Sequence, residues 1–239
     1  MCDQSRYVGN CLLRSMDSAV RNRLLEKSEI VSLPAEQVIY EPGRHLTHVY
    51  FPIDLVASLL YTTRSGSTSE VAIVGNDGML GVSVCLGGDC TPTYAVVLNA
   101  GSAYRVRVQL VRDELMRCES LQTLLLRYVQ TLMTQASMMA ACNRHHSIDQ
   151  QLRRLLLMSM DRLGSGELFM THELIANCLG VRREGITEAA RHLQSAGIIA
   201  YHRGRIHILD RSRLETTCCE CYSVVKREAE FLFPLPQAA

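Results

Sequence analysis

The sequence predicts an α+β fold with an N-terminal β jelly roll, a long central helix and a C-terminal winged helix-turn-helix. Three observations predict it. Short apolar runs separated by turn residues fill about 29–108, the segment 110–142 contains neither glycine nor proline, and 171–209 combine two amphipathic helices with a hairpin. We expect the three parts to have the boundaries 1–109, 110–146 and 147–239.

The N-terminal part begins with helical periodicity from Cys11 to Glu26. Six runs with the composition of strands follow, and most of them stop at proline, glycine or asparagine. They are 38–40, 48–51, 56–61, 71–74, 94–98 and 104–108. Such regular spacing favours an antiparallel barrel or jelly roll.

The central segment 110–142 is rich in Leu, Met, Gln and Arg, which favour a long helix. Apolar residues step along it by four and three, as a seam for a partner helix requires. They are Leu125, Val129, Leu132, Ala136 and Met139. The seam could instead pack on the chain's own jelly roll. We favour a parallel dimer helix, because helix-turn-helix proteins use twofold symmetry to span two half-sites.

The C-terminal part begins with a helix from Ile148, which we expect to end at Gly164-Ser165-Gly166. Thr171 can cap the next helix, and Gly180 suits the left-handed turn after it. A second helix then buries an apolar stripe of Ile186, Ala189, Ala190 and Leu193. The chain continues through a helix stop at Gly197 into a hairpin that turns at 203–205, so the segment predicts a winged helix-turn-helix.

Polar residues on the second helix and the wing suit a DNA contact. For the helix we predict base readout, since arginine can bind guanine and glutamate can accept from cytosine. These residues are Arg182, Arg183, Glu184, Thr187, Glu188 and Arg191. For phosphate contacts we predict Arg203 and Arg205 on the wing, with Thr171 and His172 at the first helix. The alternative for these side chains is a solvated charged face. The alternative for the whole segment is an ordinary buried helical hairpin, which does not account for the wing or the outward arginines.

Composition limits the other possibilities. The 239 residues suggest two domains, and the net charge of +1 restricts any nucleic-acid footprint to a local patch. The ten cysteines form no repeating framework, and we find no signal peptide or membrane-length apolar run. We therefore expect a soluble cytoplasmic protein with no membrane partner.

The order of jelly roll, long helix and winged helix resembles the Crp/Fnr family of transcription regulators over about residues 30–214. Arg183-Glu184 is similar to the Arg-Glu pair of the family's recognition helix, which contacts guanine and cytosine. The segments 142–147 and 152–156 are similar to the family's hinge and first DNA-domain helix. The resemblance implies a cyclic-nucleotide-binding-like sensor domain and a homodimer that binds an inverted repeat in double-stranded DNA. We also expect RNA polymerase as a partner.

The chain departs from the family in the half-site and in the effector pocket. Glu188 stands where many members have arginine, and Arg182 replaces the usual capping serine. The family's nucleotide pocket has a Gly-Glu-Leu turn and an Arg-Ser-Ala run, whose arginine pairs with the cyclic phosphate. The corresponding segments here, 77–82 and 89–94, lack that glutamate and that arginine. We therefore expect no cyclic-AMP binding, no cofactor and an unknown effector.

Cysteine chemistry is the alternative source of a signal. Cys2 and Cys11 are too few for the N-terminal iron–sulfur motif of the anaerobic regulators. Cys218, Cys219 and Cys221 could bind metal or form a dithiol switch, but we favour a packing role on a C-terminal helix with Leu214, Tyr222, Val225 and Phe231. Cys142 and His146 have a metal-ligand spacing, with His145 beside them, yet two ligands are too few. We predict no metal site.

Two other functions stay open. A redox- or metal-sensing protein could use Cys218–Cys221 while its winged helix contacts another protein. A thiol oxidoreductase would need an exposed cysteine of low pKa. The sequence has neither a Gly-x-Ser-x-Gly elbow nor a Walker loop, so we expect no catalytic residues and no enzyme.

Overall fold

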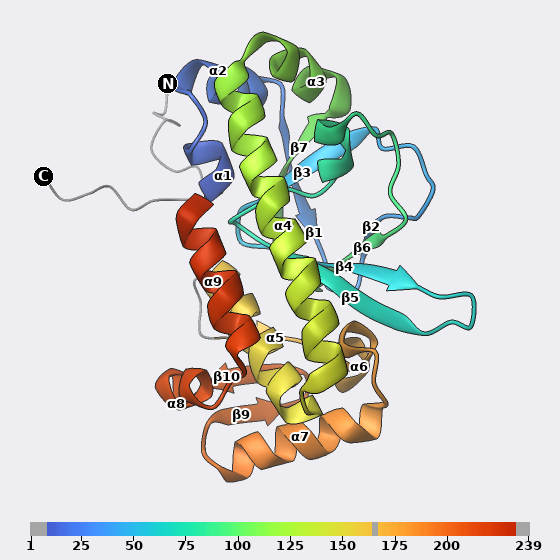
Figure 1. The fold of residues 1–239 in the computed structure, drawn as a ribbon, viewed down its shortest axis with the longest axis vertical. Coiled ribbons are helices and arrows are strands. Elements are labelled where there is room, and N and C mark those ends of the chain that lie inside the picture. The colour runs from blue at the N-terminus through green and yellow to red at the C-terminus, as the bar shows by residue number, and fades with distance from the viewer. Residues whose placement is uncertain (1–8, 164–166, 233–239) are drawn as a thin grey trace, which may run out of the picture.

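The computed structural model describes residues 9–163 and 167–232 and has the predicted α+β order. In Figure 1 the strands of the N-terminal part lie beside the long helix α4, and the winged helix lies at one end of the molecule. The helices are α1 (Cys11–Arg14), α2 (Ser18–Glu26), α3 (Val108–Arg117), α4 (Glu119–His145), α5 (Ile148–Leu163), α6 (His172–Leu179), α7 (Arg183–Ser195), α8 (Arg211–Thr216) and α9 (Glu220–Leu232). Among these described segments, no helix is both long and apolar enough to cross a membrane.

The N-terminal strands form two antiparallel sheets that we call the jelly roll. Its strands are β1 (Glu29–Leu33), β2 (Val38–Tyr40), β3 (His48–Pro52), β4 (Val56–Thr62), β5 (Thr68–Val74), β6 (Tyr94–Asn99) and β7 (Gly101–Arg107). One sheet has the order β1-β7-β3 and the other β2-β6-β4-β5. Buried residues such as Leu55, Ala57 and Val97 fill the core. The six predicted strand runs are confirmed, and a 3₁₀ helix η2 (Val82–Leu86) follows β5.

Two of the predicted helices are interrupted. The helix expected over 11–26 is divided into α1 and α2, and Asn10 caps α1 through the backbone N–H of Leu13 at 2.9 Å. The helix expected over 110–142 breaks at Cys118, whose backbone is extended. The hydroxyl of Ser120 donates to Asp17 at 2.5 Å at this corner. The sequence prediction missed the break because the contact joins residues far apart in the chain.

The predicted seam of α4 lies partly inside the chain. Leu125 and Met139 are each 1% exposed and pack inside the chain, so they cannot meet a partner helix. The large apolar residues that α4 exposes are Leu126 and Met133, at 57% and 61%. The outward apolar stripe of α4 therefore lies on a different side of the helix from the predicted seam. The reason is that the jelly roll and α9 cover the two ends of that seam, at Leu125 and Met139.

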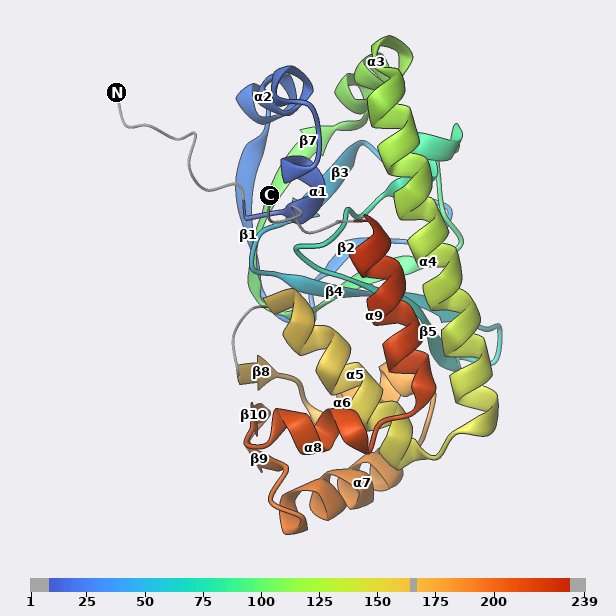
Figure 2. The ribbon, with the colours of Figure 1, turned by 60° about the vertical axis from the view of Figure 1, so that its left-hand side comes forward.

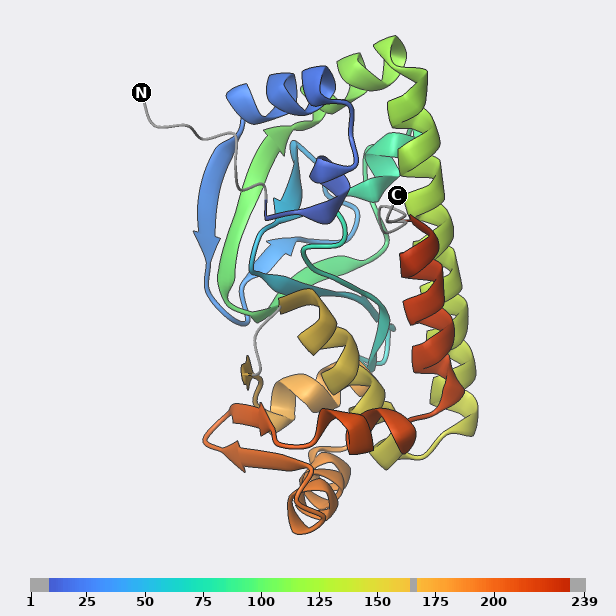
Figure 3. The ribbon, with the colours of Figure 1, turned by 90° about the vertical axis from the view of Figure 1, so that its left-hand side faces the viewer.

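The C-terminal segment forms two helices instead of the single one expected. The helix α8 ends at Thr216, and the hydroxyl of the capping residue Thr217 donates to the carbonyl of Arg213 at 2.6 Å. The chain then turns, and α9 runs along α4 in all three views (Figures 1, 2 and 3). Tyr222 and Val225 are buried as predicted, whereas Phe231 is 79% exposed.

The winged-helix part packs directly on the jelly roll. The backbone N–H of Phe169 donates to Asn99 at 2.8 Å, and the hydroxyl of Thr68 donates to the carbonyl of Asn177 at 2.6 Å. One hydrophobic cluster includes Ile73 from the jelly roll and Leu156 from α5. The two parts therefore share a continuous core in this structure.

We predict that Tyr128 holds α4 to the jelly roll. Its buried hydroxyl accepts from the N–H of Met79 and donates to the Met79 carbonyl, both at 3.0 Å. Tyr128→Phe should lower the free energy of unfolding by about 1–3 kcal/mol, because both backbone groups lose their partner. Urea denaturation measures the change. Tyr61→Phe, at a tyrosine 47% exposed, is the matched control and should stay within about 0.5 kcal/mol; equal effects of the two variants would refute the prediction.

Candidate nucleic-acid interface

The helix-turn-helix is built as the sequence predicts. The Thr171 hydroxyl accepts from the N–H of Leu174 at 3.1 Å and caps α6. Gly180 ends that helix with φ of 65°, a left-handed conformation that costs glycine little. A Cβ at this position would also lie 2.7 Å from the carbonyl oxygen of Thr68. Gly180 therefore serves both the turn and the contact with the jelly roll.

The helix α7 buries one face and exposes the other. Its buried stripe is Ile186, Ala189, Ala190 and Leu193, as predicted. The helix lies at the end of the molecule away from the jelly roll (Figures 1 and 3). Five of the predicted base-contacting residues are exposed at its start or along it: Arg182, Arg183, Glu184, Glu188 and Arg191. The structure thus gathers a mixed cationic and anionic face on one accessible helix.

Thr187 and His172 contact each other rather than standing free. The Thr187 hydroxyl lies 3.0 Å from Nδ1 of His172, and the imidazole stacks on Tyr201 with ring centroids 4.6 Å apart. Burial, together with the charge of Arg183, lowers the pKa of His172. The imidazole therefore favours its neutral form, and this group fixes α6, α7 and the wing relative to one another.

The wing is a three-stranded sheet of order β8-β10-β9, with β8 (Glu167–Phe169), β9 (Ile199–His202) and β10 (Arg205–Ile208). The sequence predicted β9 and β10, but β8 is only three residues long and gave no recognisable run. Arg203 and Gly204 both have positive φ, at 49° and 81°. A two-residue hairpin turn of this kind matches the twist of its strands.

The wing arginines differ in their surroundings. Arg203 is exposed at the turn. Arg205 is 63% exposed, but its guanidinium lies 5.2 Å from the ring centroid of Phe169 and 3.8 Å from Glu167. Thr171 is exposed as well, with its hydroxyl 3.4 Å from Glu36 of the jelly roll. Two of the predicted phosphate contacts, Arg205 and Thr171, therefore lie near carboxylates.

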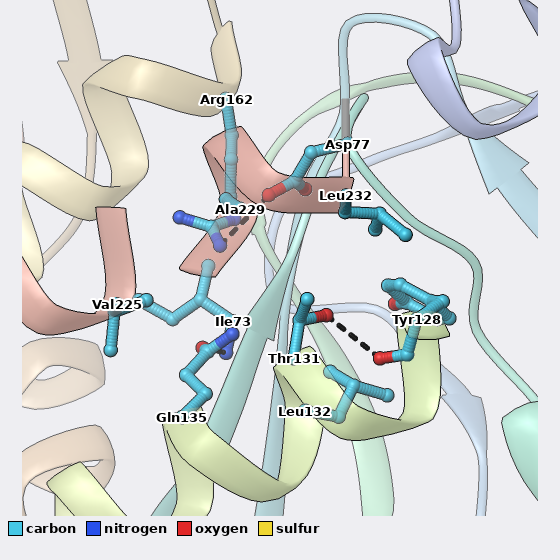
Figure 4. Close-up of a pocket in the computed structure, with 10 residues that line it drawn as sticks. All are labelled: Ile73, Asp77, Tyr128, Thr131, Leu132, Gln135, Arg162, Val225, Ala229 and Leu232. Atoms are coloured by element: carbon cyan, nitrogen blue, oxygen red, sulfur yellow. Dashed lines mark hydrogen bonds and ion pairs between the residues drawn. The ribbon is translucent and has the colours of Figure 1, made fainter. Parts of the chain in front are cut away.

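The segment that corresponds to the family's nucleotide turn packs tightly under α4. A Cβ on Gly78 would lie 2.3 Å from the Tyr128 hydroxyl. The cavity beside it holds about 10 Å³, room for one water at most. Figure 4 shows its lining from the jelly roll, α4, α5 and α9, closed on one side by the 2.9 Å ion pair between Arg162 and Asp77. In the segment 89–94, which the sequence analysis compared with the family's Arg-Ser-Ala run, Asp89 forms an ion pair with Arg112.

The structure joins two sets of cysteine and histidine residues that the sequence analysis treated separately. Cys142 and His146 lie against Cys219 and Cys221, and their four ligand atoms are within 4.8 Å of one another. His145 is exposed and outside this group, and Cys2 lies outside the described residues. Sequence spacing could not show the grouping, because α4 and α9 meet only in the folded chain.

Comparison with known proteins agrees with this geometry. Residues 150–217 match the model of the Crp-like helix-turn-helix domain. The global nitrogen regulator of Synechococcus elongatus is 22% identical over 183 residues, which are 73% of this chain and 82% of that protein. The corresponding regulator from Nostoc is 23% identical over 181 residues, covering 72% of this chain and 81% of that protein.

Solved structures share the fold of most of the chain. FixK2 from Bradyrhizobium japonicum has a TM-score of 0.66 at 16% identity and covers 80% of this chain and 98% of its own. A putative transcriptional regulator of the Crp/Fnr family from Eubacterium rectale has a TM-score of 0.65 at 19% identity, covering 86% and 96%. The chain therefore carries a Crp-like helix-turn-helix DNA-binding domain on the fold of the Crp/Fnr transcription regulators, the family that its sequence motifs resemble.

Proposed function

We propose that the protein is a homodimeric, sequence-specific transcription regulator that binds an inverted repeat without cyclic AMP. The observation that carries the proposal is the exposed polar face of α7, which begins with Arg183 and Glu184 beside an arginine-bearing wing. A helix of this kind can enter the major groove, and a wing can lie along the phosphate backbone.

Within this face we assign base readout to the first turns of α7. The Arg183 guanidinium can donate two hydrogen bonds to guanine, and the Glu184 carboxylate can accept from the amino group of cytosine. Glu188 is exposed one turn later, where an acid disfavours a nearby phosphate and favours a base-amino donor. We assign phosphate contacts to Arg203 and Arg205. Thr187 and His172 position the two helices through their mutual contact.

Dimer formation is assigned to the outward stripe of α4. Leu126, Val129, Met133 and Ala140 follow one another by three, four and seven residues, so they share a face. Leu126 and Met133 are more than half exposed in the single chain, which leaves a partner to cover them. A parallel pair of α4 helices would place two winged helices on the same face of the DNA. We further propose RNA polymerase as a partner of the bound dimer.

Independence from cyclic AMP is supported by the tight packing of the turn at Gly78 under α4. Small-molecule sites occupy about 300–1,000 Å³, far above the cavity of about 10 Å³ beside Tyr128. The turn at Gly78 also lies too close to the Tyr128 hydroxyl for a side chain there. An effector would therefore have to bind away from this turn.

The first test concerns base readout. Glu184→Ala should relax discrimination at one base pair of each half-site by about 1–3 kcal/mol, because a carboxylate acceptor for cytosine is lost. Selection of bound sequences from random duplex DNA measures the preference. Glu230→Ala, at an exposed position of α9, is the control and should leave the selected motif unchanged. An unchanged motif for Glu184→Ala would show that the readout is assigned to the wrong residue.

The second test concerns the wing. Arg203→Ala should weaken binding about equally on all sequences and reduce the slope of log K against log salt by about two per dimer, because each subunit loses one phosphate contact. Arg205→Ala should act in the same direction. Arg44→Ala, at an exposed arginine of the jelly roll, should leave the slope unchanged. A sequence-dependent loss for Arg203→Ala would place this residue on a base instead.

The third test concerns the dimer. Met133→Lys should shift the protein to monomer and lower operator affinity at least tenfold, since it places a charge in the apolar stripe of α4. Sedimentation velocity and DNA titration measure the two effects. Ile30→Lys changes an apolar residue on β1 that is 66% exposed and should alter neither. A dimer that survives Met133→Lys would move the interface away from this stripe.

A further inference from the structure

We propose that Cys142, His146, Cys219 and Cys221 bind a single zinc ion that fastens the end of α4 to the start of α9. The four ligand atoms lie within 4.8 Å of one another, and all three cysteines are buried. The sequence analysis predicted no metal site, because each helix alone supplies an incomplete set. Three thiolates and one imidazole are a donor set that structural zinc sites use.

The spacing of the donors fits one tetrahedral ion. The Sγ atoms of Cys142 and Cys219 are 3.7 Å apart, and Sγ of Cys221 is 3.7 Å from Nδ1 of His146. With zinc–sulfur bonds of about 2.3 Å and zinc–nitrogen bonds of about 2.0–2.1 Å, the edges of a tetrahedron measure about 3.8 Å and 3.5 Å. Small side-chain movements would complete the site. The common iron–sulfur clusters take four cysteines, whereas the fourth group here is an imidazole.

The histidine is oriented as a metal ligand requires. Nδ1 of His146 faces the thiols, and Nε2 lies 3.5 Å from the carboxylate of Glu220. A carboxylate beside the distal nitrogen holds the proton there and leaves the other nitrogen free to bind metal. Glu220 begins α9, so this contact also comes from the meeting of the two helices.

A buried positive charge beside the thiols supplies an independent argument. Arg154 of α5 is 0% exposed, and none of its three guanidinium nitrogens has a hydrogen-bond partner among the described residues. Its charge acts on the thiols of Cys142 and Cys218 and on Glu70. A zinc ion with three thiolates and a neutral imidazole carries a net charge of −1. Such a centre would offset the buried guanidinium, as buried charges require.

A disulfide between Cys142 and Cys219 is the competing use of these thiols. It would leave Cys221 and His146 without a common role and would add no negative charge near Arg154. Zinc binding, by contrast, releases the thiol protons and retains all four groups as ligands. The two possibilities differ in metal content and in the number of free thiols.

The site would set the position of the winged helix. At the end of α4 the chain passes into α5, and α9 returns along α4 after the wing and α8. A zinc ion between α4 and α9 would close this loop of chain at its base. Where the proposed function holds, zinc should therefore favour the arrangement of winged helices that binds DNA.

The first experiment measures metal alone, on the full chain purified under reducing conditions. We expect one zinc per chain by elemental analysis. Cobalt(II) added to the zinc-free protein should give the intense visible bands and thiolate charge-transfer absorption of a tetrahedral thiolate site. Cys219→Ser and Cys221→Ser should each lower zinc affinity at least 100-fold. Cys218→Ser and Cys90→Ser, at cysteines outside the set, should leave it unchanged.

Several results would overturn the proposal. The proposal is refuted if the fully reduced wild-type protein takes up neither zinc nor cobalt. This test does not depend on the folding of any variant. A Cys142–Cys219 disulfide with no metal uptake after its reduction would assign the thiols to redox chemistry. Loss of zinc in Cys218→Ser would mean that the ligand set is wrong.

A second experiment separates the metal site from the proposed function. Removing zinc with a chelator should weaken operator binding at least tenfold, and added zinc should restore it. Bound zinc with unchanged operator affinity would refute the coupling to DNA. Bound zinc in a protein that selects no DNA would refute the proposed function and leave the metal site standing.

Discussion

The structure depends on the way α4 divides its surface. One face is buried by the jelly roll, α5 and α9, through residues such as Leu125, Tyr128 and Met139. Because these contacts fix the rotation of the helix about its axis, they also decide which residues face outward. The same packing determines the outward stripe of Leu126 and Met133, closes the space beside the turn at Gly78 and brings the end of α4 against α9. A change in helix rotation would alter all three together.

The features that the sequence predicted correctly have local causes. Thr171 caps a helix and Gly180 ends it within a few residues, and the stripe at Ile186 repeats with the helical period. Strand runs that stop at proline or glycine were recognised for the same reason. The position of Arg183-Glu184 on an exposed helix follows from that local pattern, so most of the candidate interface could be inferred before the fold was known.

The features that the sequence did not predict arise from contacts between distant segments. The break at Cys118 depends on Asp17, and the burial of Leu125 and Met139 depends on α9 and the jelly roll. Spacing along one helix cannot show that His146 faces Cys221 from another. The same applies to the stacking of His172 on Tyr201, which joins two segments that are far apart in the sequence.

The close approach of Gly180 to Thr68 has a mechanical consequence. The turn between α6 and α7 rests on the hairpin of β4 and β5, and the Thr68 hydroxyl holds the carbonyl of Asn177 just before that turn. A displacement of the hairpin is therefore transmitted to the base of α7 across a single layer of atoms, without passing through α4. The jelly roll and the winged-helix part are connected here by a direct joint as well as by a shared helix.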